Sequence, residues 1–392
     1  MIELLQGIKI LDLSRLLPGP LCSMYLADMG AEVIKIEDNI VGDYTRWDPP
    51  KAKENSVFFL MINRNKKSIR LNLKEPEGYE IFCKMVKDAD VVLEQFRPGV
   101  VEKLKVDYST LKKINPGLVY CSLTGFGQDG PYRDMAAHDL NYIGYAGLLG
   151  QTGRRGGPPV IPGTQTADQA GGSLMAVMGI LAALLGRGKT GKGEYVDVSM
   201  TDGVFSLMPI SLGIMFGTNE TSERGEAFLT GGSPCYDVYE TKDEKFMALG
   251  ALEPKFWGNF CKAVKLDDLI EHQFPKGEML DDVRRKVEAV FKKKTRDDWT
   301  NFFSEVDACC TPVLELHETV QNEQLLSRRM ILDMEHPVEG NIKQLGFPIK
   351  FENYNFEIKS PPPMWGEHTD EILFSLGYSE EDIKRLRDKK VL

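Results

Sequence analysis

Segments with the spacing of strands and of helices alternate along the first 125 residues of this 392-residue chain. Each strand-like run is short and apolar, and each helical segment has apolar residues three or four positions apart. The strand-like runs are 8–13, 32–37, 90–94 and 118–123, and the helical segments are 21–29, 76–89 and 100–114. This alternation predicts a parallel sheet covered by helices, so the expected fold class is α/β.

The rest of the chain adds a second set of elements, and the length alone suggests two or three domains. A Gly- and Pro-rich stretch covers 124–166, and an apolar helix is expected over 170–187. The later segments are a strand over 193–198, a helix and connector over 201–224, a hairpin over 236–249, a charged helical stretch over 256–303 and a final helix over 379–388. The hairpin and the charged stretch indicate a second unit.

Charge and composition exclude several classes of protein. The formal net charge is −10, whereas general nucleic-acid binders carry basic surfaces. The N-terminus carries Glu3 where a secretory signal has a basic flank, and the apolar run 174–186 is thirteen residues long, short of the roughly 20 that span a bilayer. Seven scattered cysteines without a CxxC pair do not fit a zinc or disulfide framework.

We therefore expect a cytoplasmic protein without nucleic-acid or membrane partners, in which the run 174–186 is a buried helix. An anionic ligand would need a local cluster of cations, because the chain as a whole is acidic.

Two glycine-rich motifs approach nucleotide-binding patterns and then depart from them. The segment 125–130 fits G-x-G-x-x-G after a strand, but Pro131 follows it instead of an apolar helix. The segment 186–193 approaches a P-loop, but Gly193 stands where Ser or Thr would bind magnesium. We favour a loop for the first segment and a helix-to-strand turn for the second.

Of the five histidines, His138 is the one outside charged, solvent-like surroundings. It lies in the Gly-rich stretch just before an apolar segment, and Asp168 follows thirty residues later at the start of the apolar helix. A carboxylate at a helix N-terminus can simply cap the helix. Alternatively, an imidazole and a carboxylate that flank one pocket form an acid/base pair. These residues alone leave both interpretations open.

Six segments spread along nearly the whole chain resemble signatures of one enzyme family, the class III CoA-transferase family of CaiB/BaiF type. They are 27–37 (ADMGAEVIKIE), 96–100 (FRPGV), 124–128 (TGFGQ), 179–183 (GILAA), 190–193 (TGKG) and 366–373 (GEHTDEIL). The family holds both CoA transferases and racemases, so membership leaves the reaction open.

Three local resemblances favour the racemase members. The segment 138–142 resembles the racemase segment that carries the catalytic histidine. The segment 167–172 resembles the racemase segment that carries the catalytic aspartate, and 250–256 resembles the segment whose glutamate supports that aspartate. The resemblance thus implies His138, Asp168 and Glu253 as catalytic residues. The implied reaction interconverts the (R) and (S) forms of 2-methylacyl-CoA thioesters by two-base α-proton transfer through an enolate, with no metal and no cofactor besides the CoA of the substrate.

CoA transfer between carboxylic acids is the alternative reaction. Transferases of the family use the same aspartate, here Asp168, as a nucleophile that forms an acyl anhydride and then an aspartyl-CoA thioester. They generally lack a His-Asp pair at the position of His138, which makes His138 the residue that separates the two reactions.

The resemblance also implies where CoA binds. The segment 71–74 would contact the adenosine and Arg97 the phosphates, while Arg64 belongs to a cationic cluster just before that segment. The implied CoA-binding residues are Arg64, Leu71, Asn72, Leu73, Lys74, Arg97, Ala137, Asp139, Leu140, Asn141 and Tyr142. Asp38 stands where some racemases have a phosphate-binding arginine, and the run 164–169 predicts a rather polar acyl pocket beside Asp168.

By resemblance, the fold is a large Rossmann-like domain with a parallel sheet, built from both chain ends, plus a smaller α/β domain. The implied divisions are 1–200 for the N-terminal part of the large domain, 201–224 for a connector helix, 225–311 for the small domain, and 312–392 for a connector and the return to the large domain. Family members form interlocked homodimers with the active site between subunits, so we expect this chain to pair with a second copy.

Overall fold

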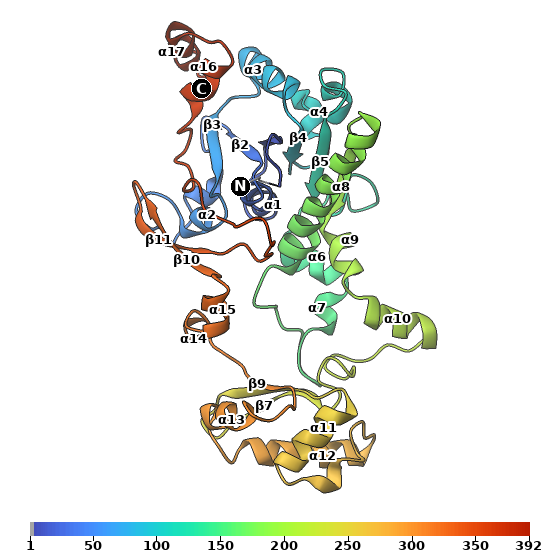
Figure 1. Cartoon of the computed structure of the whole chain (residues 1–392). Coiled ribbons are helices and arrows are strands. Elements are labelled where there is room, and N and C mark those ends of the chain that lie inside the picture. The colour runs from blue at the N-terminus through green and yellow to red at the C-terminus, as the bar shows by residue number, and fades with distance from the viewer. Residues whose placement is uncertain (1–3) are drawn as a thin grey trace. The chain divides into compact units, whose positions relative to one another are not determined.

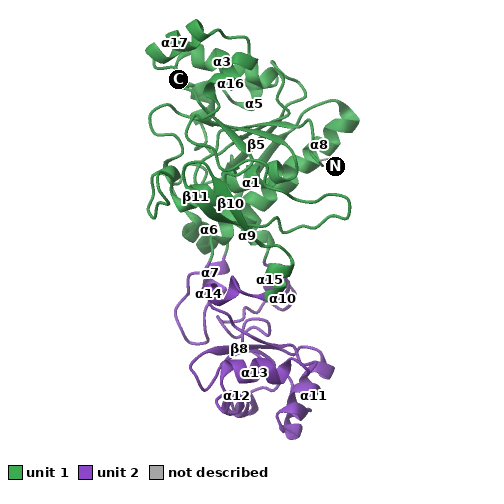
Figure 2. Ribbon diagram, turned by 60° about the vertical axis from the view of Figure 1, so that its left-hand side comes forward, with its two compact units in different colours: residues 1–146, 164–207, 323–392 green, residues 147–163, 208–322 purple. Residues whose placement is uncertain are grey.

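The computed structural model describes residues 4–392, which form two compact units (Figure 2). Unit 1 contains the described residues up to 146 together with 164–207 and 323–392, and unit 2 contains 147–163 and 208–322. Glu3, on which the predicted lack of a signal sequence rests, lies outside the described residues.

Unit 1 is built on a parallel sheet of six strands in the order β3-β2-β1-β4-β5-β6 (Figure 1). The strands are β1 (Lys9–Asp12), β2 (Glu32–Glu37), β3 (Lys66–Arg70), β4 (Val91–Glu94), β5 (Val119–Thr124) and β6 (Tyr195–Ser199). The predicted α/β class and parallel sheet are confirmed. Strand order reverses between β1 and β4, which is the point where open sheets of this order bind ligands.

The helices of unit 1 begin and end where capping residues and left-handed turns allow. The first of them are α1 (Pro18–Asp28), α2 (Val57–Met61), α3 (Pro76–Lys87), α4 (Val100–Leu104), α5 (Tyr108–Leu111) and α6 (Asp139–Tyr145), with a short 3-10 turn η1 (Tyr44–Arg46). The single helix predicted over 100–114 is wrong. Lys105 adopts a φ of 60° and ends α4, and the Asp107 side chain then accepts a hydrogen bond from the Thr110 backbone N–H to start α5.

The predicted helix over 170–187 is longer than expected and begins with a π-helical turn. The π-helical turn η2 (Ala167–Leu174) runs directly into α8 (Met175–Thr190). Together, these 24 residues are long and apolar enough to cross a membrane by length and composition alone. The prediction of a buried helix is wrong for the single chain, because only Ala176 and Ile180 of α8 are buried while Met178 is 61% exposed.

Close glycine packing fixes the start of η2. The helix α9 (Met200–Ser206) lies against η2, and a Cβ atom on Gly203 would come within 2.1 Å of the Gly171 carbonyl oxygen. Only glycine permits this approach of two backbones. The contact holds the turn that carries Asp168 against α9.

The C-terminal segment 323–392 belongs to unit 1. Its elements are α15 (Glu323–Ser327), β10 (Ile331–His336), β11 (Gly340–Leu345), α16 (Thr369–Ser375) and α17 (Glu380–Asp388). The His368 backbone N–H donates to the Ser68 carbonyl oxygen at 2.9 Å, and the Asn72 N–H donates to the Val391 carbonyl oxygen at 2.8 Å. The chain end is therefore hydrogen-bonded to β3 and to the segment that follows it.

Unit 2 contains an antiparallel sheet of three strands, β7 (Tyr236–Glu240), β8 (Phe246–Gly250) and β9 (Cys310–Pro312). Its helices are α7 (Leu148–Gln151), α10 (Pro209–Thr218), α11 (Pro254–Ala263), η3 (Asp267–Leu269), α12 (Glu278–Phe291), α13 (Arg296–Phe303) and α14 (Leu316–Thr319). The core is aromatic, with Trp257, Phe260 and Phe291 fully buried. The predicted hairpin is confirmed by the antiparallel pairing of β7 with β8.

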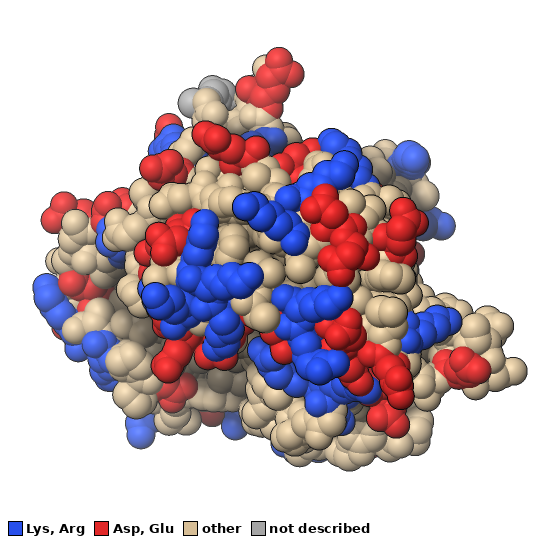
Figure 3. All heavy atoms as spheres, turned by 90° about the horizontal axis from the view of Figure 1, so that it is seen from below, with Lys and Arg blue, Asp and Glu red and all other residues tan. Residues whose placement is uncertain are grey.

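Surface charges are mixed despite the acidic total. Figure 3 shows Lys and Arg side chains gathered near the middle of one face, with Asp and Glu side chains among and around them. Ion pairs in unit 2 have the same character, for example Lys286 with Asp268 at 3.0 Å and Lys292 with Glu240 at 2.6 Å. Exposed pairs of this kind are solvated and contribute little to stability.

Candidate active site

A cavity of about 450 Å³ opens at the carboxyl edge of the parallel sheet, and polar and apolar groups share its wall about equally. We call it the polar cavity because its wall includes three arginines. Its wall includes Arg15 after β1, Tyr44 after β2, Phe96 after β4 and Gly125 after β5. The loops that follow β1 and β4 meet here because the order of the strands reverses between them.

A second cavity of about 620 Å³ lies in the same unit and has a mostly apolar wall. Its apolar side chains come from three regions, namely the loop before α1 and α1 itself, α2, and the C-terminal segment; they include Leu17, Leu21, Met24, Tyr25, Phe58, Met61, Ile62, Met330, Leu345 and Pro348. Thr164, Gln165 and Gln169 add a polar border. The run 164–169 thus contributes polar residues beside Asp168, while α1, α2 and the C-terminal segment supply most of the apolar wall. The polarity of the acyl pocket stays a prediction.

The two cavities share three lining residues, Leu16, His138 and Asp168. The histidine and the aspartate, thirty positions apart in sequence, thus lie together where the polar cavity meets the apolar one. A group held between them would have polar surroundings on one side and apolar surroundings on the other.

Asp168 lies in a setting that suits proton transfer near neutral pH. Burial and the negative charge of Asp139 raise the pKa of the Asp168 carboxyl to about 7. One carboxylate oxygen of Asp139 accepts hydrogen bonds from the backbone N–H groups of Ala167, at 2.7 Å, and of Asp168, at 3.1 Å. Asp139 therefore caps the start of η2, and the carboxylate of Asp168 accepts no hydrogen bond from any described residue. The capping interpretation left open above does not apply to Asp168.

His138 directly precedes α6 and stands at the position that caps this helix. Its backbone N–H donates to the Asn141 side-chain oxygen at 3.0 Å, which fixes the main chain at the start of the helix. The Asn141 backbone N–H faces the His138 side chain in a capping-box arrangement and donates to the His138 carbonyl oxygen at 2.8 Å. His138 also lines both cavities, where its imidazole can accept or donate a proton at a ligand.

Two arginines on the wall of the polar cavity, Arg15 and Arg97, form no ion pair with any carboxylate of the described residues. The Arg15 guanidinium lies over the rings of Tyr44, at 5.5 Å, and Phe96, at 5.9 Å, and Arg97 stands on the same wall. A third arginine, Arg133, is paired with Asp134 at 3.1 Å. Arg97 was expected from the resemblance, whereas the sequence analysis missed Arg15. Its place directly after the first strand was the signal that could have identified it.

The other implied CoA-binding residues fall into three groups. Ala137, Asn141 and Tyr142 line the polar cavity, while Asp139 and Leu140 do not. The residues 71–74 follow β3 at the same edge of the sheet but line neither cavity, and Leu71 is buried in the core. Their contacts with CoA stay predictions.

Arg64 is the implied residue whose surroundings differ most from expectation. It is 1% exposed, pairs with Asp28 at 2.6 Å, and lines the apolar cavity instead of the polar one. Because the charge and N–H donors of this guanidinium are already paired with a buried carboxylate, Arg64 is poorly placed to bind a phosphate.

Glu253 lies in unit 2, directly before α11, and its support of Asp168 stays a prediction. Among residues 4–392, no group of three or more His, Cys, Asp and Glu side chains is arranged to hold a metal ion.

Comparisons with known proteins identify the family. Residues 5–369 match the family described as CoA-transferase family III. Human alpha-methylacyl-CoA racemase is 36% identical over 99% of this chain and 97% of its own length. Mouse succinyl-CoA:glutarate CoA-transferase is 34% identical over 97% of this chain and 88% of its length. Formyl-CoA:oxalate CoA-transferase of Rhodopseudomonas palustris is 31% identical over 100% of this chain and 98% of its length.

Solved structures agree with this result. A CAIB/BAIF family protein from Brucella suis superposes with a TM-score of 0.82 at 27% identity, covering 95% of this chain and 98% of that one. The protein Rv3272 from M. tuberculosis superposes with a TM-score of 0.81 at 26% identity, covering 95% of this chain and 99% of that one. These matches define the class of the protein, an α/β enzyme of the superfamily that contains CoA transferases and racemases. The chain belongs to CoA-transferase family III, in which racemases and CoA transferases are both near relatives.

Proposed function

We propose that this enzyme racemises 2-methylacyl-CoA thioesters. The observation that carries the proposal is that His138 and Asp168 are shared by a cavity with two unpaired arginines and an apolar cavity. An acyl-CoA has a polyanionic end and an apolar end, and its α-carbon lies where they join. Bound across the junction, it would place the α-carbon between the imidazole and the carboxylate.

The reaction needs one group to remove the α-proton and another to return a proton to the opposite face. In one direction the Asp168 carboxylate takes the α-proton and leaves an enolate, and the His138 imidazolium then protonates the same carbon. In the other direction the two groups exchange roles, and each reaction leaves the pair with one proton in total. A pKa near 7 suits Asp168 for both roles.

The acyl group proposed for the second cavity is hydrophobic. Its wall carries leucine, methionine and aromatic side chains, and its volume of about 620 Å³ suits a chain of many carbons. CoA is the only cofactor-like group in this proposal, and it arrives with the substrate.

CoA transfer is the second candidate, and one observation favours it. The Asp168 carboxylate is half-buried and has no hydrogen-bond partner among the described residues, which suits a nucleophile as well as a base. Relatives of both kinds have similar identity to the chain. His138 is the reason to prefer racemisation, because an imidazole beside the aspartate supplies the second base.

We further propose a homodimer in the cytoplasm. The exposed apolar residues of α8, such as Met178 at 61% and Leu185 at 69%, would be covered by a second copy instead of by a membrane.

Deuterium uptake tests the proposal. A single enantiomer of a 2-methylacyl-CoA is incubated with enzyme in D₂O, without any acceptor acid, and deuterium at the α-carbon is followed by mass spectrometry. Uptake together with formation of the other enantiomer is expected. No uptake, combined with rapid CoA movement once an acceptor acid is added, would establish the transferase instead.

A further inference from the structure

Leu16, the third residue of the junction, has an unusual backbone. Its φ is 67°, in the left-handed region that glycine and asparagine tolerate and that a bulky, branched side chain rarely adopts. Such strain persists only where surrounding contacts hold it, and it gathers at functional sites. Here the strained residue lines both cavities beside His138 and Asp168.

A buried ion pair holds this backbone. An Asp43 carboxylate oxygen accepts a hydrogen bond from the Leu16 N–H at 3.2 Å, and the other oxygen pairs with the Lys35 ammonium at 2.9 Å. The same ammonium donates to the Ser14 carbonyl oxygen at 2.7 Å. This ion pair therefore hydrogen-bonds to the backbone at Ser14 and at Leu16, on both sides of Arg15. Neither of its two side chains is more than 1% exposed.

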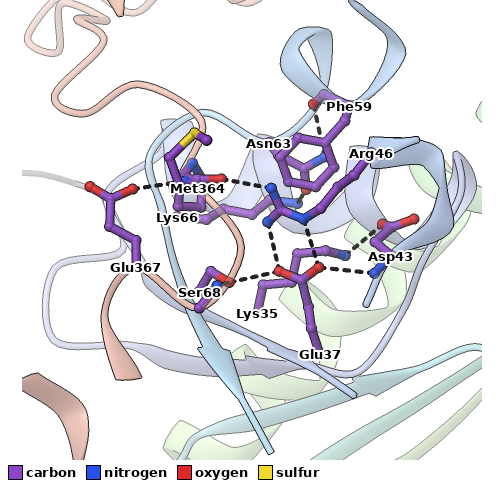
Figure 4. A network of polar contacts seen from close by, with 12 residues as sticks. Lys35, Glu37, Asp43, Arg46, Phe59, Asn63, Lys66, Ser68, Met364 and Glu367 are labelled. Atoms are coloured by element: carbon purple, nitrogen blue, oxygen red, sulfur yellow. Dashed lines mark hydrogen bonds and ion pairs between the residues drawn. The ribbon is translucent and has the colours of Figure 1, made fainter. Parts of the chain in front are cut away.

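The ion pair is itself part of a larger network (Figure 4). Figure 4 shows Asp43 beside Glu37, and the Asp43 N–H donates to a Glu37 carboxylate oxygen at 2.9 Å. Glu37 pairs with the buried Arg46 at 2.7 Å, and Arg46 donates to the Pro363 carbonyl oxygen at 2.9 Å. The contacts that support Leu16 thus extend from the loop after β1 and from β2 to the C-terminal segment, and all of the supporting residues are buried.

We propose that Leu16 is a specificity-determining residue, held by the Lys35–Asp43 pair so that it separates the two cavities and limits the substituent on the α-carbon. The proposal rests on the proposed binding of acyl-CoA across the junction. It does not depend on whether the reaction at that carbon is racemisation or CoA transfer, because either reaction places the acyl end there.

The first test measures selectivity at the α-carbon. Acyl-CoA thioesters of equal chain length, with a 2-methyl or a 2-ethyl group, are compared by kcat/KM for whichever reaction the wild type performs. One methylene in an apolar pocket changes discrimination roughly 10–200-fold. Leu16→Ala is expected to raise the ratio of 2-ethyl to 2-methyl at least tenfold. An unchanged ratio would overturn the proposal even if deuterium uptake succeeds.

The second test separates strain from ordinary packing. Leu16→Gly relieves the left-handed backbone and removes the side chain, so the denaturation midpoint should hold or rise while the selectivity is lost. Lys105→Gly is the matched control, because Lys105 has a φ of 60° on an exposed turn outside both cavities. It should gain similar stability and keep wild-type selectivity. A loss of selectivity in the control equal to that of Leu16→Gly would refute the assignment.

Asp43→Asn tests the positioning role. The amide still accepts a hydrogen bond from the Leu16 N–H but no longer attracts Lys35, so the 2-ethyl to 2-methyl ratio should move in the direction of Leu16→Ala. A folded variant with the wild-type ratio would remove the ion pair from the proposal. If the variant does not fold, the two Leu16 variants decide the specificity claim.

Discussion

At the scale of single residues, we expect the number of protons held by the pair His138 and Asp168 to govern the pH dependence of the reaction. A two-base racemase needs one proton on the pair, so kcat/KM should fall at acid pH, where the pair holds two protons, and at alkaline pH, where it holds none. The profile should be the same for both enantiomers, because their equilibrium constant does not change with pH. A nucleophilic Asp168 must be ionised, so a transferase would lose rate only on the acid side. Initial rates from pH 5 to 9 with each enantiomer distinguish the two.

The raised pKa of Asp168 also has a consequence for stability. Burial and Asp139 favour the neutral carboxyl in the folded state, so this contribution is complete below pH 4 and is lost as the pH rises through about 7. Asp168→Asn removes the charge, and it should stabilise the protein at pH 8 by on the order of a few kcal/mol, with little effect at pH 4. Urea denaturation at both pH values measures this, and a variant less stable than wild type at pH 8 would contradict the raised pKa.

Arg15 is expected to bind phosphate without touching the reacting carbon. Arg15→Ala should raise KM for acyl-CoA roughly tenfold or more and leave kcat within a few-fold, because remote contacts stabilise ground and transition states about equally. The effect should vanish with acyl-pantetheine thioesters, which lack the phosphates. Arg15→Lys keeps the charge but not the stacking on Tyr44 and Phe96, so its KM for acyl-CoA should lie between those of the wild type and of Arg15→Ala.

At the scale of elements, α6 is coupled to η2 through Asp139. Its carboxylate caps η2 and raises the pKa of Asp168. Asp139→Asn keeps an oxygen for the two N–H groups and removes the charge, so the pH profile should shift to lower pH and activity at pH 6 should rise several-fold relative to pH 8. A shift to higher pH would contradict the electrostatic role of Asp139.

The elements also show what the sequence alone can predict. Strands with continuous apolar runs were found, and β2 matches the predicted 32–37. The strand β3 was missed because its sequence, KKSIR, is mostly polar. Its buried Lys66 donates a hydrogen bond to the Pro20 carbonyl oxygen at 2.8 Å and lies 3.5 Å from Asp12. Pairing of that kind depends on partners distant in sequence. The pair His138 and Asp168 was proposed from local resemblance, whereas the positions of Arg15 and Leu16 depend on which loops meet at the sheet edge and on one φ angle.

At the scale of the whole molecule, the exposed apolar face of α8 predicts a partner. We expect sedimentation to give twice the chain mass of 44.0 kDa. In a dimer, Met178→Glu would bury a charge and should lower the free energy of unfolding by about 1–3 kcal/mol, whereas an exposed site in a monomer would change by less than about 0.5 kcal/mol. Lys189→Gln, on an exposed position near the end of α8, is the control. A monomer in which Met178→Glu is neutral would contradict the proposed dimer.

The two-base assignment is tested most directly by following deuterium uptake and configuration together in single variants. Each enantiomer of one 2-methylacyl-CoA is incubated in D₂O with His138→Ala or with Asp168→Ala. Each variant should lose racemisation by roughly 10²–10⁴-fold and still exchange the α-proton of one enantiomer with retention. The enantiomer that exchanges should differ between the two variants. Two results would contradict the account. One is racemisation at the wild-type rate by His138→Ala, and the other is robust CoA transfer by the same variant.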